Sequence, residues 1–312
     1  GNFDGFHIAH QELAKKVVSI AKQTQTKSSL LLFKKHSRHK ADSKYLTTLN
    51  DKISYIDKLG IDIVFLIDFD EKFKHLSPDE FIENILLKSC KAKNIIVGKD
   101  YKFAYKAKGN VNYLINVEKK YNFKTYILDD VMVNSDLVSS TLIKSLLNNA
   151  NINKANLLLG RPYSIQGEVI KGFGRGKDFG YPTANISNND KYFLPKDGVY
   201  YTISQYKGKK YHSMTSIGDN PTFDDLLEKV IEVYICDFNQ DIYGETVQLE
   251  FIKYLRPMYK FASIDELIDN LDKDYREVIE LSKLYKINWE CYNNKSTVTL
   301  VLGVPVQNKV IR

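Results

Sequence analysis

The chain changes character near Gly160, and this change constrains the fold more than any other feature of the sequence. Before that point, some segments repeat apolar residues with the helical period of about 3.6 residues, while others are short continuous apolar runs. Runs of the second kind are typical of strands buried on both faces of a parallel sheet. Because the two kinds alternate, we expect an α/β domain with a doubly wound sheet. The expected helices are 8–24, 52–59 and 78–89, and the expected strands are 28–33, 61–69, 94–98 and 124–133.

After Gly160, the residues Gly, Pro, Thr and Asn become frequent, and short segments alternate apolar with polar side chains. Five or six short strands separated by turns predict a small antiparallel β-barrel. Ser263 and Glu266 are spaced as in a capping box, which predicts a final helix that ends near Leu284. The expected strands of this part are 164–170, 199–205, 211–217, 230–237 and 246–252.

These features divide the chain into an N-terminal domain, 1–158, a C-terminal domain, 159–285, and a tail, 286–312. The sequence does not indicate a role for the tail, although its apolar stretch at 298–304 could add a strand. The chain opens directly on the turn-like residues 1–5. A strand normally feeds such a turn, so we expect that a preceding segment is missing from this sequence.

Composition excludes several classes of protein. The net charge of +7 comes from 45 basic and 38 acidic residues that are mostly interleaved, and a basic rim around a phosphate ligand explains it, so we expect no nucleic-acid partner. No apolar run approaches the ~20 residues of a membrane helix, so we expect no membrane contact. Cys90, Cys236 and Cys291 are too unevenly spaced for a disulfide scaffold or a clustered zinc site, which indicates a reducing compartment, the cytoplasm.

Two histidines, His7 and His10, lie three residues apart where the first helix is expected to begin. At that spacing, side chains at a helix start can converge on one ligand. The free N–H groups and partial positive charge of a helix start favour phosphate. Two imidazole donors could stabilise negative charge while a phosphoryl oxygen bond forms and breaks. Taken alone, the pair could equally be two surface histidines near a chain end.

The whole string Gly1–His10 resembles the signature GxFDGxHxGH of the bacterial bifunctional riboflavin kinase/FMN adenylyltransferase (FAD synthetase) family, with Ala9 in place of Gly. Residues 97–104 resemble the family segment VGxxFxFG, and Ser139–Lys144 resembles its SSTxIR motif, with Lys144 in place of Arg. The family segment TFxPHP keeps only its Phe and His here, as Phe33 and His36. The resemblance implies catalytic roles for His7 and His10, flavin binding by Asp100, and nucleotide binding by Asn2, Phe3, Asp4, Gly5, Ser139, Ser140, Thr141 and Lys144.

A glycine-rich stretch, 172–185, is the most informative segment of the second domain. Its four glycines let backbone N–H groups approach a phosphate, and Arg175 and Lys177 add positive charge. Thr183 and Asn185 lie two apart on an extended segment and therefore point to the same side, where their neutral oxygens suit Mg²⁺ shared with nucleotide phosphates. The GK[ST] of a P-loop is absent, and a glycine-rich stretch alone is more often a hairpin loop.

The same stretch resembles the riboflavin kinase signature GxGRGxxxGxPTAN at every specified position. The resemblance, which covers about residues 1–285, implies that Glu232 is the kinase base, on the opposite strand face from Ile231 and Val233. It also implies that Arg256 lies near the flavin, although a structural ion pair would explain this residue equally well. The remaining implied roles are nucleotide binding by Gly172, Gly174, Arg175, Gly176, Lys177 and Asn220, and metal binding by Thr183 and Asn185.

We therefore expect an enzyme that phosphorylates riboflavin to FMN with Mg²⁺ and ATP and adenylylates FMN to FAD. One alternative is riboflavin kinase activity alone, with an impaired adenylyltransferase domain. Ala9, Lys144 and the Phe33–Ser37 segment depart from the family pattern, and the expected first strand is missing. An alternative of another class is a non-catalytic regulator that binds flavin or nucleotide. The sequence does not indicate an oligomeric state.

Overall fold

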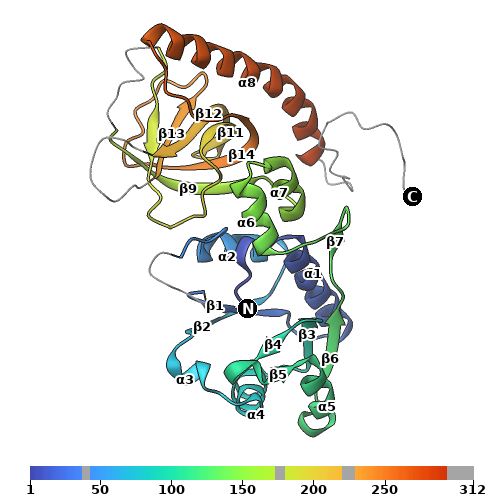
Figure 1. Cartoon of the computed structure of the whole chain (residues 1–312). Coiled ribbons are helices and arrows are strands. Elements are labelled where there is room, and N and C mark those ends of the chain that lie inside the picture. Colours follow the sequence, from blue (N-terminus) through green and yellow to red (C-terminus); the bar gives the residue numbers. More distant parts are fainter. Residues whose placement is uncertain (37–42, 173–179, 220–228, 294–312) are drawn as a thin grey trace. The chain divides into compact units, whose positions relative to one another are not determined.

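The structure is a computed structural model that describes residues 1–36, 43–172, 180–219 and 229–293, the last nine of these as helix backbone only. It divides into two compact units (Figure 1). The N-terminal unit contains Gly1–Ile165 together with Asn188–Lys196, and the C-terminal unit contains Gln166–Ser187 and the residues from Asp197 onward. The chain therefore returns once to the N-terminal unit after the barrel has begun.

The N-terminal unit contains two pairs of parallel strands, which confirms its predicted α/β class. Strand β1, Ser29–Phe33, pairs with β2, Ile63–Ile67, and strand β3, Asn94–Gly98, pairs with β6, Lys124–Leu128. The prediction of one long strand over 124–133 is wrong. Two aspartates follow β6 and disfavour strand, so the chain instead turns into a short antiparallel hairpin. That hairpin consists of β7, Met132–Val133, and β8, Asp136–Leu137.

Helices α2 to α7 of this unit begin at side-chain caps that the sequence carries, whereas α1 has no such cap. Ser77 and Glu80 form the predicted capping box, in which each side chain accepts a hydrogen bond from the other residue's backbone N–H. The helix that starts there continues to Ser89, with π-helical bonding over its second part. The helical elements are η1 (Asp4–Phe6), α1 (Ile8–Gln23), α2 (Leu49–Lys58), α3 (Glu71–Lys74), α4 (Pro78–Glu80), η2 (Phe81–Ser89), η3 (Tyr105–Ala107), α5 (Val111–Tyr121), α6 (Ser140–Asn148) and α7 (Ile152–Leu159), and the short strands β4 (Lys102–Phe103) and β5 (Gly109–Asn110) pair with each other.

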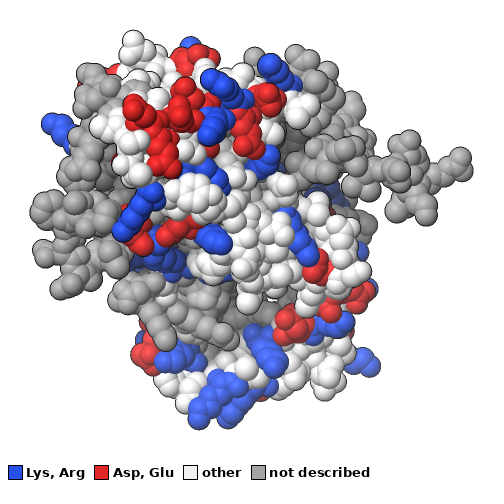
Figure 2. All heavy atoms as spheres, turned by 45° about the horizontal axis from the view of Figure 1, so that its top comes forward, with Lys and Arg blue, Asp and Glu red and all other residues white. Residues whose placement is uncertain are grey.

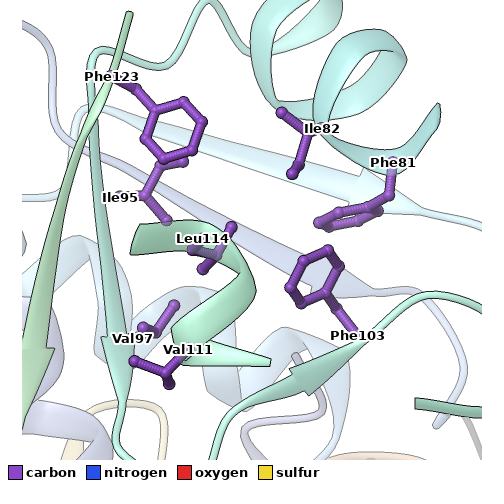
Figure 3. Close-up of a cluster of buried hydrophobic side chains, with 8 residues drawn as sticks. All are labelled: Phe81, Ile82, Ile95, Val97, Phe103, Val111, Leu114 and Phe123. Atoms are coloured by element: carbon purple, nitrogen blue, oxygen red, sulfur yellow. The ribbon is translucent and has the colours of Figure 1, made fainter. Parts of the chain in front are cut away.

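Two apolar clusters hold these elements together. In the first, side chains from η2, β3, β4 and α5 converge, as Figure 3 shows. In the second, Phe6 packs with residues of α1, β1 and α2 and is 1% exposed, so the turn that carries the predicted site is anchored in the core. The first cluster contains Phe81, Ile82, Ile95, Val97, Phe103, Val111, Leu114 and Phe123.

The C-terminal unit is the predicted antiparallel barrel. Its described strands close in the order β10-β13-β12-β11-β14-β9. Strand β10, which places the predicted metal ligand Asn185, is only three residues long and was not predicted as a separate strand. The strands are β9 (Tyr163–Ile170), β10 (Ala184–Ile186), β11 (Gly198–Tyr206), β12 (Lys209–Asp219), β13 (Lys229–Ile235) and β14 (Thr246–Arg256).

One face of β11 and β12 carries a chain of buried hydroxyl groups, which we call the hydroxyl ladder: Thr202, Ser204, Ser213 and Thr215. Ser213 Oγ lies 2.8 Å from the hydroxyl oxygens of both Thr202 and Ser204, and Thr202 Oγ1 lies 2.7 Å from Thr215 Oγ1. All four residues are fully buried, and each hydroxyl has a hydrogen-bond partner, as a buried polar group requires. The ladder therefore fills part of the barrel interior with paired polar groups.

The other face of these strands packs against helix α8, Ile264–Asn293. Val278 of α8 is fully buried against Tyr201, Ile203 and Met214. The predicted end of the helix near Leu284 is wrong, because its backbone continues to Asn293.

In Figure 2, acidic and basic side chains are interspersed in the upper part of the view. Each helix in the described part of the chain is too short or too polar to cross a bilayer.

Candidate active sites

Six of the eight predicted nucleotide-binding residues of the N-terminal unit line a cavity of about 340 Å³, which Gly5 and Ser139 do not line. All of its lining residues except His36 were predicted site residues. A larger cavity of about 850 Å³ is lined by His7, His10, Ser139 and Asp100, among others, so Asp100 lies at the same cavity as both histidines. The lining residues of the smaller cavity are Asn2, Phe3, Asp4, His10, His36, Ser140, Thr141 and Lys144.

Asp4 holds the turn and the start of α6 together. Its carboxylate accepts a hydrogen bond from the backbone N–H of Leu46 at 2.8 Å and lies 2.9 Å from Lys144 Nζ. Its carbonyl oxygen accepts a hydrogen bond from Ser140 Oγ at 2.8 Å. Gly5 follows with φ +78°, and a Cβ there would lie 2.9 Å from Leu46 Cδ1, so only glycine fits. A hydrogen bond and an ion pair therefore join the turn of the first motif to the distant Ser139–Lys144 motif.

The two histidines stack on each other, with ring centroids 3.7 Å apart. The Nδ1 atoms of both rings are buried and have no hydrogen-bond partner. Burial lowers the pKa of His7 to about 4, although Asp4 opposes the effect, and burial together with the neighbouring His7 lowers the pKa of His10 well below its usual value. Both rings are therefore neutral at pH 7 and can each donate one N–H bond to a ligand.

Two residues that support the turn were not among the predicted site residues. Lys52 is 8% exposed and donates to the backbone oxygen of Asn2 at 3.0 Å, and burial lowers the pKa of its ammonium group. Thr47 Oγ1 accepts a hydrogen bond from Gly5 N at 2.9 Å. The available sequence signal for Lys52 was its position four residues before Ile56, which puts it on the apolar face of the expected helix.

In the C-terminal unit, Asn185 of β10, Glu232 of β13 and Ser216 of β12 lie directly opposite one another on three neighbouring strands. Directly opposite residues in antiparallel strands have their side chains on the same face, so these three form one row. Ile231 and Val233 are buried on the other face of β13, while Glu232 is half-buried. Ser216 was not predicted, because a single serine in a strand carries no sequence signal.

Asn185 packs against the backbone of Gly172, where a Cβ would lie only 1.8 Å from Asn185 Nδ2. Thr183 immediately precedes β10. The described residues contain no group of three or more His, Cys, Asp or Glu side chains that could hold a metal. Mg²⁺ usually takes one or two protein carboxylates beside substrate phosphates and water, so the Glu232 carboxylate opposite Asn185, with the neutral oxygens of Asn185 and Thr183, fits it. Gly174, Arg175, Gly176, Lys177 and Asn220 lie outside the described residues, as does the apolar stretch 298–304.

Arg256, at the end of β14, forms a buried ion pair with Asp274 of α8. Its Nε lies 3.0 Å from both carboxylate oxygens of Asp274, and its Nη2 lies 2.8 Å from one of them. The guanidinium also lies over the rings of Tyr259 and Phe261, 5.5 and 5.6 Å from their centroids. The ion pair weighed in the sequence analysis is therefore present, and the flavin role of Arg256 stays a prediction.

Comparisons with known proteins match both units. A model described as FAD synthetase matches residues 1–142, and a model described as riboflavin kinase matches residues 159–282. A bifunctional riboflavin kinase/FMN adenylyltransferase of Listeria monocytogenes is 37% identical over 282 residues, covering 89% of each chain. The Bacillus subtilis protein of the same name is 32% identical over 300 residues, covering 89% of this chain and 90% of the relative. A solved structure described as a macrolide-efflux protein from Streptococcus pneumoniae is 34% identical, with a TM-score of 0.81, covering 88% of this chain and 91% of that one.

An α/β unit with a histidine-bearing helix start, joined to a closed antiparallel barrel, defines a two-domain nucleotide-using transferase. Both matched domains act in flavin cofactor biosynthesis. The chain belongs to the bifunctional riboflavin kinase/FMN adenylyltransferase family.

Proposed function

We propose that the C-terminal unit phosphorylates riboflavin to FMN and that the N-terminal unit adenylylates FMN to FAD, with ATP as the second substrate of both. The observation that carries the kinase half is the pairing of Asn185 with Glu232, which puts the proposed metal ligand and the proposed base on one face of the barrel. The small cavity beside His10 and Lys144 supports the adenylyltransferase half.

In the kinase step, the oxygen of the ribityl 5′-hydroxyl attacks the γ-phosphorus of ATP while Glu232 accepts the proton of that hydroxyl. The new P–O bond forms while the bond from the γ-phosphorus to the β–γ bridging oxygen breaks, and ADP leaves. The half-buried position of Glu232 suits this role, because the carboxylate is reachable yet partly shielded from water.

Thr183 and Asn185 would hold Mg²⁺ in this unit, and the bound ion would neutralise charge on the ATP phosphates. The packing of Asn185 against Gly172 supports this assignment, because it fixes the amide beside the glycine-rich stretch. Ala at either ligand position should raise the Mg²⁺ concentration needed for half-maximal FMN formation.

The adenylyl-transfer step needs no base, because the FMN phosphate is already an anionic nucleophile. One of the FMN phosphate oxygens bonds to the α-phosphorus of ATP. The bond from the α-phosphorus to the oxygen that bridges the α- and β-phosphates breaks, and pyrophosphate leaves. The neutral rings of His7 and His10 would donate N–H bonds to the phosphates, and Lys144 would neutralise charge on the leaving group.

The experiment that tests the proposal incubates the protein with riboflavin, ATP and Mg²⁺ and separates the flavins by chromatography over time. FMN followed by FAD is expected. FMN that accumulates without FAD would indicate riboflavin kinase alone, with an impaired adenylyltransferase domain. The absence of both FMN and FAD, from a protein that is folded, would contradict the enzyme and favour the flavin- or nucleotide-binding regulator.

The free thiols of Cys90 and Cys236 support the cytoplasm as the compartment.

A further inference from the structure

We propose that Gln11 and Arg161 are positioning residues of the adenylyl-transfer site, which orient the peptide before α1 so that the backbone N–H of His7 faces the nucleotide phosphates. The inference rests on the proposed adenylyltransferase function. Neither side chain belongs to the motifs that predicted the site, and neither lines the smaller cavity.

The two side chains bind the same pair of carbonyl oxygens from different elements. Gln11 Nε2 donates to Phe6 O at 2.9 Å and to Leu159 O at 2.8 Å. Arg161 Nη1 donates to the same two oxygens, each at 3.2 Å, and its Nη2 donates to Gly5 O at 2.7 Å. The turn that precedes His7 is therefore tied to the end of α7.

This arrangement fixes the direction of one N–H group. In a planar trans peptide, the carbonyl and the N–H point in opposite directions. Because the Phe6 carbonyl points toward the guanidinium, the N–H of His7 points away from it. His7 precedes the first residue of α1, so its N–H has no helical partner and belongs to the group of donors that binds phosphate at a helix start.

The packing around Arg161 leaves little room for another arrangement. Its guanidinium lies 3.8 Å from the ring centroid of Tyr55, and its Nε is buried without a hydrogen-bond partner. A Cβ at Gly160 would lie 2.8 Å from Ile8 Cγ2, so the end of α7 approaches the start of α1 closely. An unpartnered buried donor is costly, which indicates that the position of this guanidinium is constrained by the carbonyls it binds.

Arg161 also acts on the histidines through its charge. Its charge adds to the effect of burial in lowering the pKa of His7, an effect that the Asp4 carboxylate opposes. It also adds to the effects of burial, His7 and Lys52 in lowering the pKa of His10. Replacing Arg161 by a neutral residue should therefore raise both histidine pKa values, whereas replacing the neutral Gln11 should leave this charge effect intact.

The first measurement compares Gln11→Leu and Arg161→Met with the wild type. Initial rates are taken for FAD formation from FMN and for FMN formation from riboflavin in the same preparation. Lys15→Met is the matched control, because it removes one positive charge from an exposed side chain of α1. We expect kcat for FAD formation to fall about tenfold to a hundredfold, as for a small misplacement of a reacting group, with the KM for FMN little changed.

FMN formation should stay within about twofold in every variant, since the kinase residues lie in the other unit. Arg161→Lys keeps the charge but loses the forked geometry. Unlike Arg161→Met, it should therefore show the histidine pKa values of the wild type, while its kcat for FAD formation stays low. The pKa values themselves are read from a proton NMR titration of His7 and His10.

Unchanged FAD formation in both Gln11→Leu and Arg161→Met would overturn the positioning role. An equal loss of both activities would also overturn it, because that pattern indicates general destabilisation. A wild-type protein that makes no FAD would instead contradict the proposed function itself, while wild-type FAD formation with unaffected variants would contradict only the inference.

Discussion

Asn185 lies directly opposite Glu232 across the antiparallel pair of β10 and β13. Strand pairing sets this relationship, so it does not depend on the conformation of a loop. The Cβ atoms of directly opposite residues are about 4.5–5.5 Å apart, a separation that one phosphoryl group and its metal can bridge. The kinase chemistry proposed for this family member therefore rests on paired strands of the barrel.

Replacing Glu232 by Gln should slow FMN formation by about 10²- to 10⁴-fold, because the amide cannot accept the substrate proton. FAD formation from added FMN should be unaffected. Chromatography of both reactions checks this, with Glu250→Gln on β14 as the matched control, since Glu250 pairs with Lys210. Wild-type FMN formation in Glu232→Gln would remove this residue from the mechanism.

Lys144→Met should lower FAD formation by about 10²-fold, because it removes the cation at the small cavity and leaves the Asp4 carboxylate without its ion-pair partner. Lys144→Arg should keep activity within severalfold, since arginine retains the charge and adds a second donor. Steady-state rates with FMN and ATP measure both effects. Equal rates in the two variants would argue against a charge requirement at this position.

The buried His7 should make the N-terminal unit less stable in acid. Its pKa is lowered from 6.5 to about 4 in the folded protein, so between these values the unfolded chain binds a proton that the folded chain does not. Lower pH therefore favours unfolding, by up to about 3 kcal/mol once the pH falls to 4.

Urea unfolding followed by circular dichroism at pH 7, 6, 5 and 4 tests this prediction. The free energy of unfolding should decrease as the pH falls through this range, and His7→Asn should show a shallower dependence. If the variant has the same pH dependence as the wild type, another group must bind the proton.

Ser213→Ala should destabilise the barrel by about 1–3 kcal/mol, because it leaves the fully buried hydroxyls of Thr202 and Ser204 short of a partner. Thermal unfolding measures the loss. Ser216→Ala is the matched control, with the same substitution on the other face of the same strand, and should change the Tm little. A similar shift in both variants would show that the hydroxyl ladder contributes nothing specific.

Local signals predicted the parts of the fold that depend on neighbouring residues. The box of Ser77 and Glu80 was predictable because it is a local cap, and α1 was predictable because its apolar residues repeat with the helical period. The helix α5 was not predicted, since its Val111 and Leu114 become recognisable as a core face only when η2 and β3 pack on them.

The candidate sites divide in the same way. The residues of the turn were predictable because they form one continuous string, from Asn2 to His10. The hydrogen bonds from Gln11 to Leu159 and from Arg161 to Gly5 join residues about 150 positions apart and end on backbone oxygens. Every residue type offers such an oxygen, so the sequence cannot reveal which one is used.

The hydroxyl ladder also determines how β11 and β12 can align during folding. Thr202 pairs with Ser213, and the large side chains Tyr201 and Met214 alternate with them on the other face. A slip of one residue would turn the hydroxyls toward α8 and drive tyrosine and methionine into the barrel interior. The ladder thus disfavours any alignment that turns these strands over, and so helps to fix which face of the hairpin the barrel encloses.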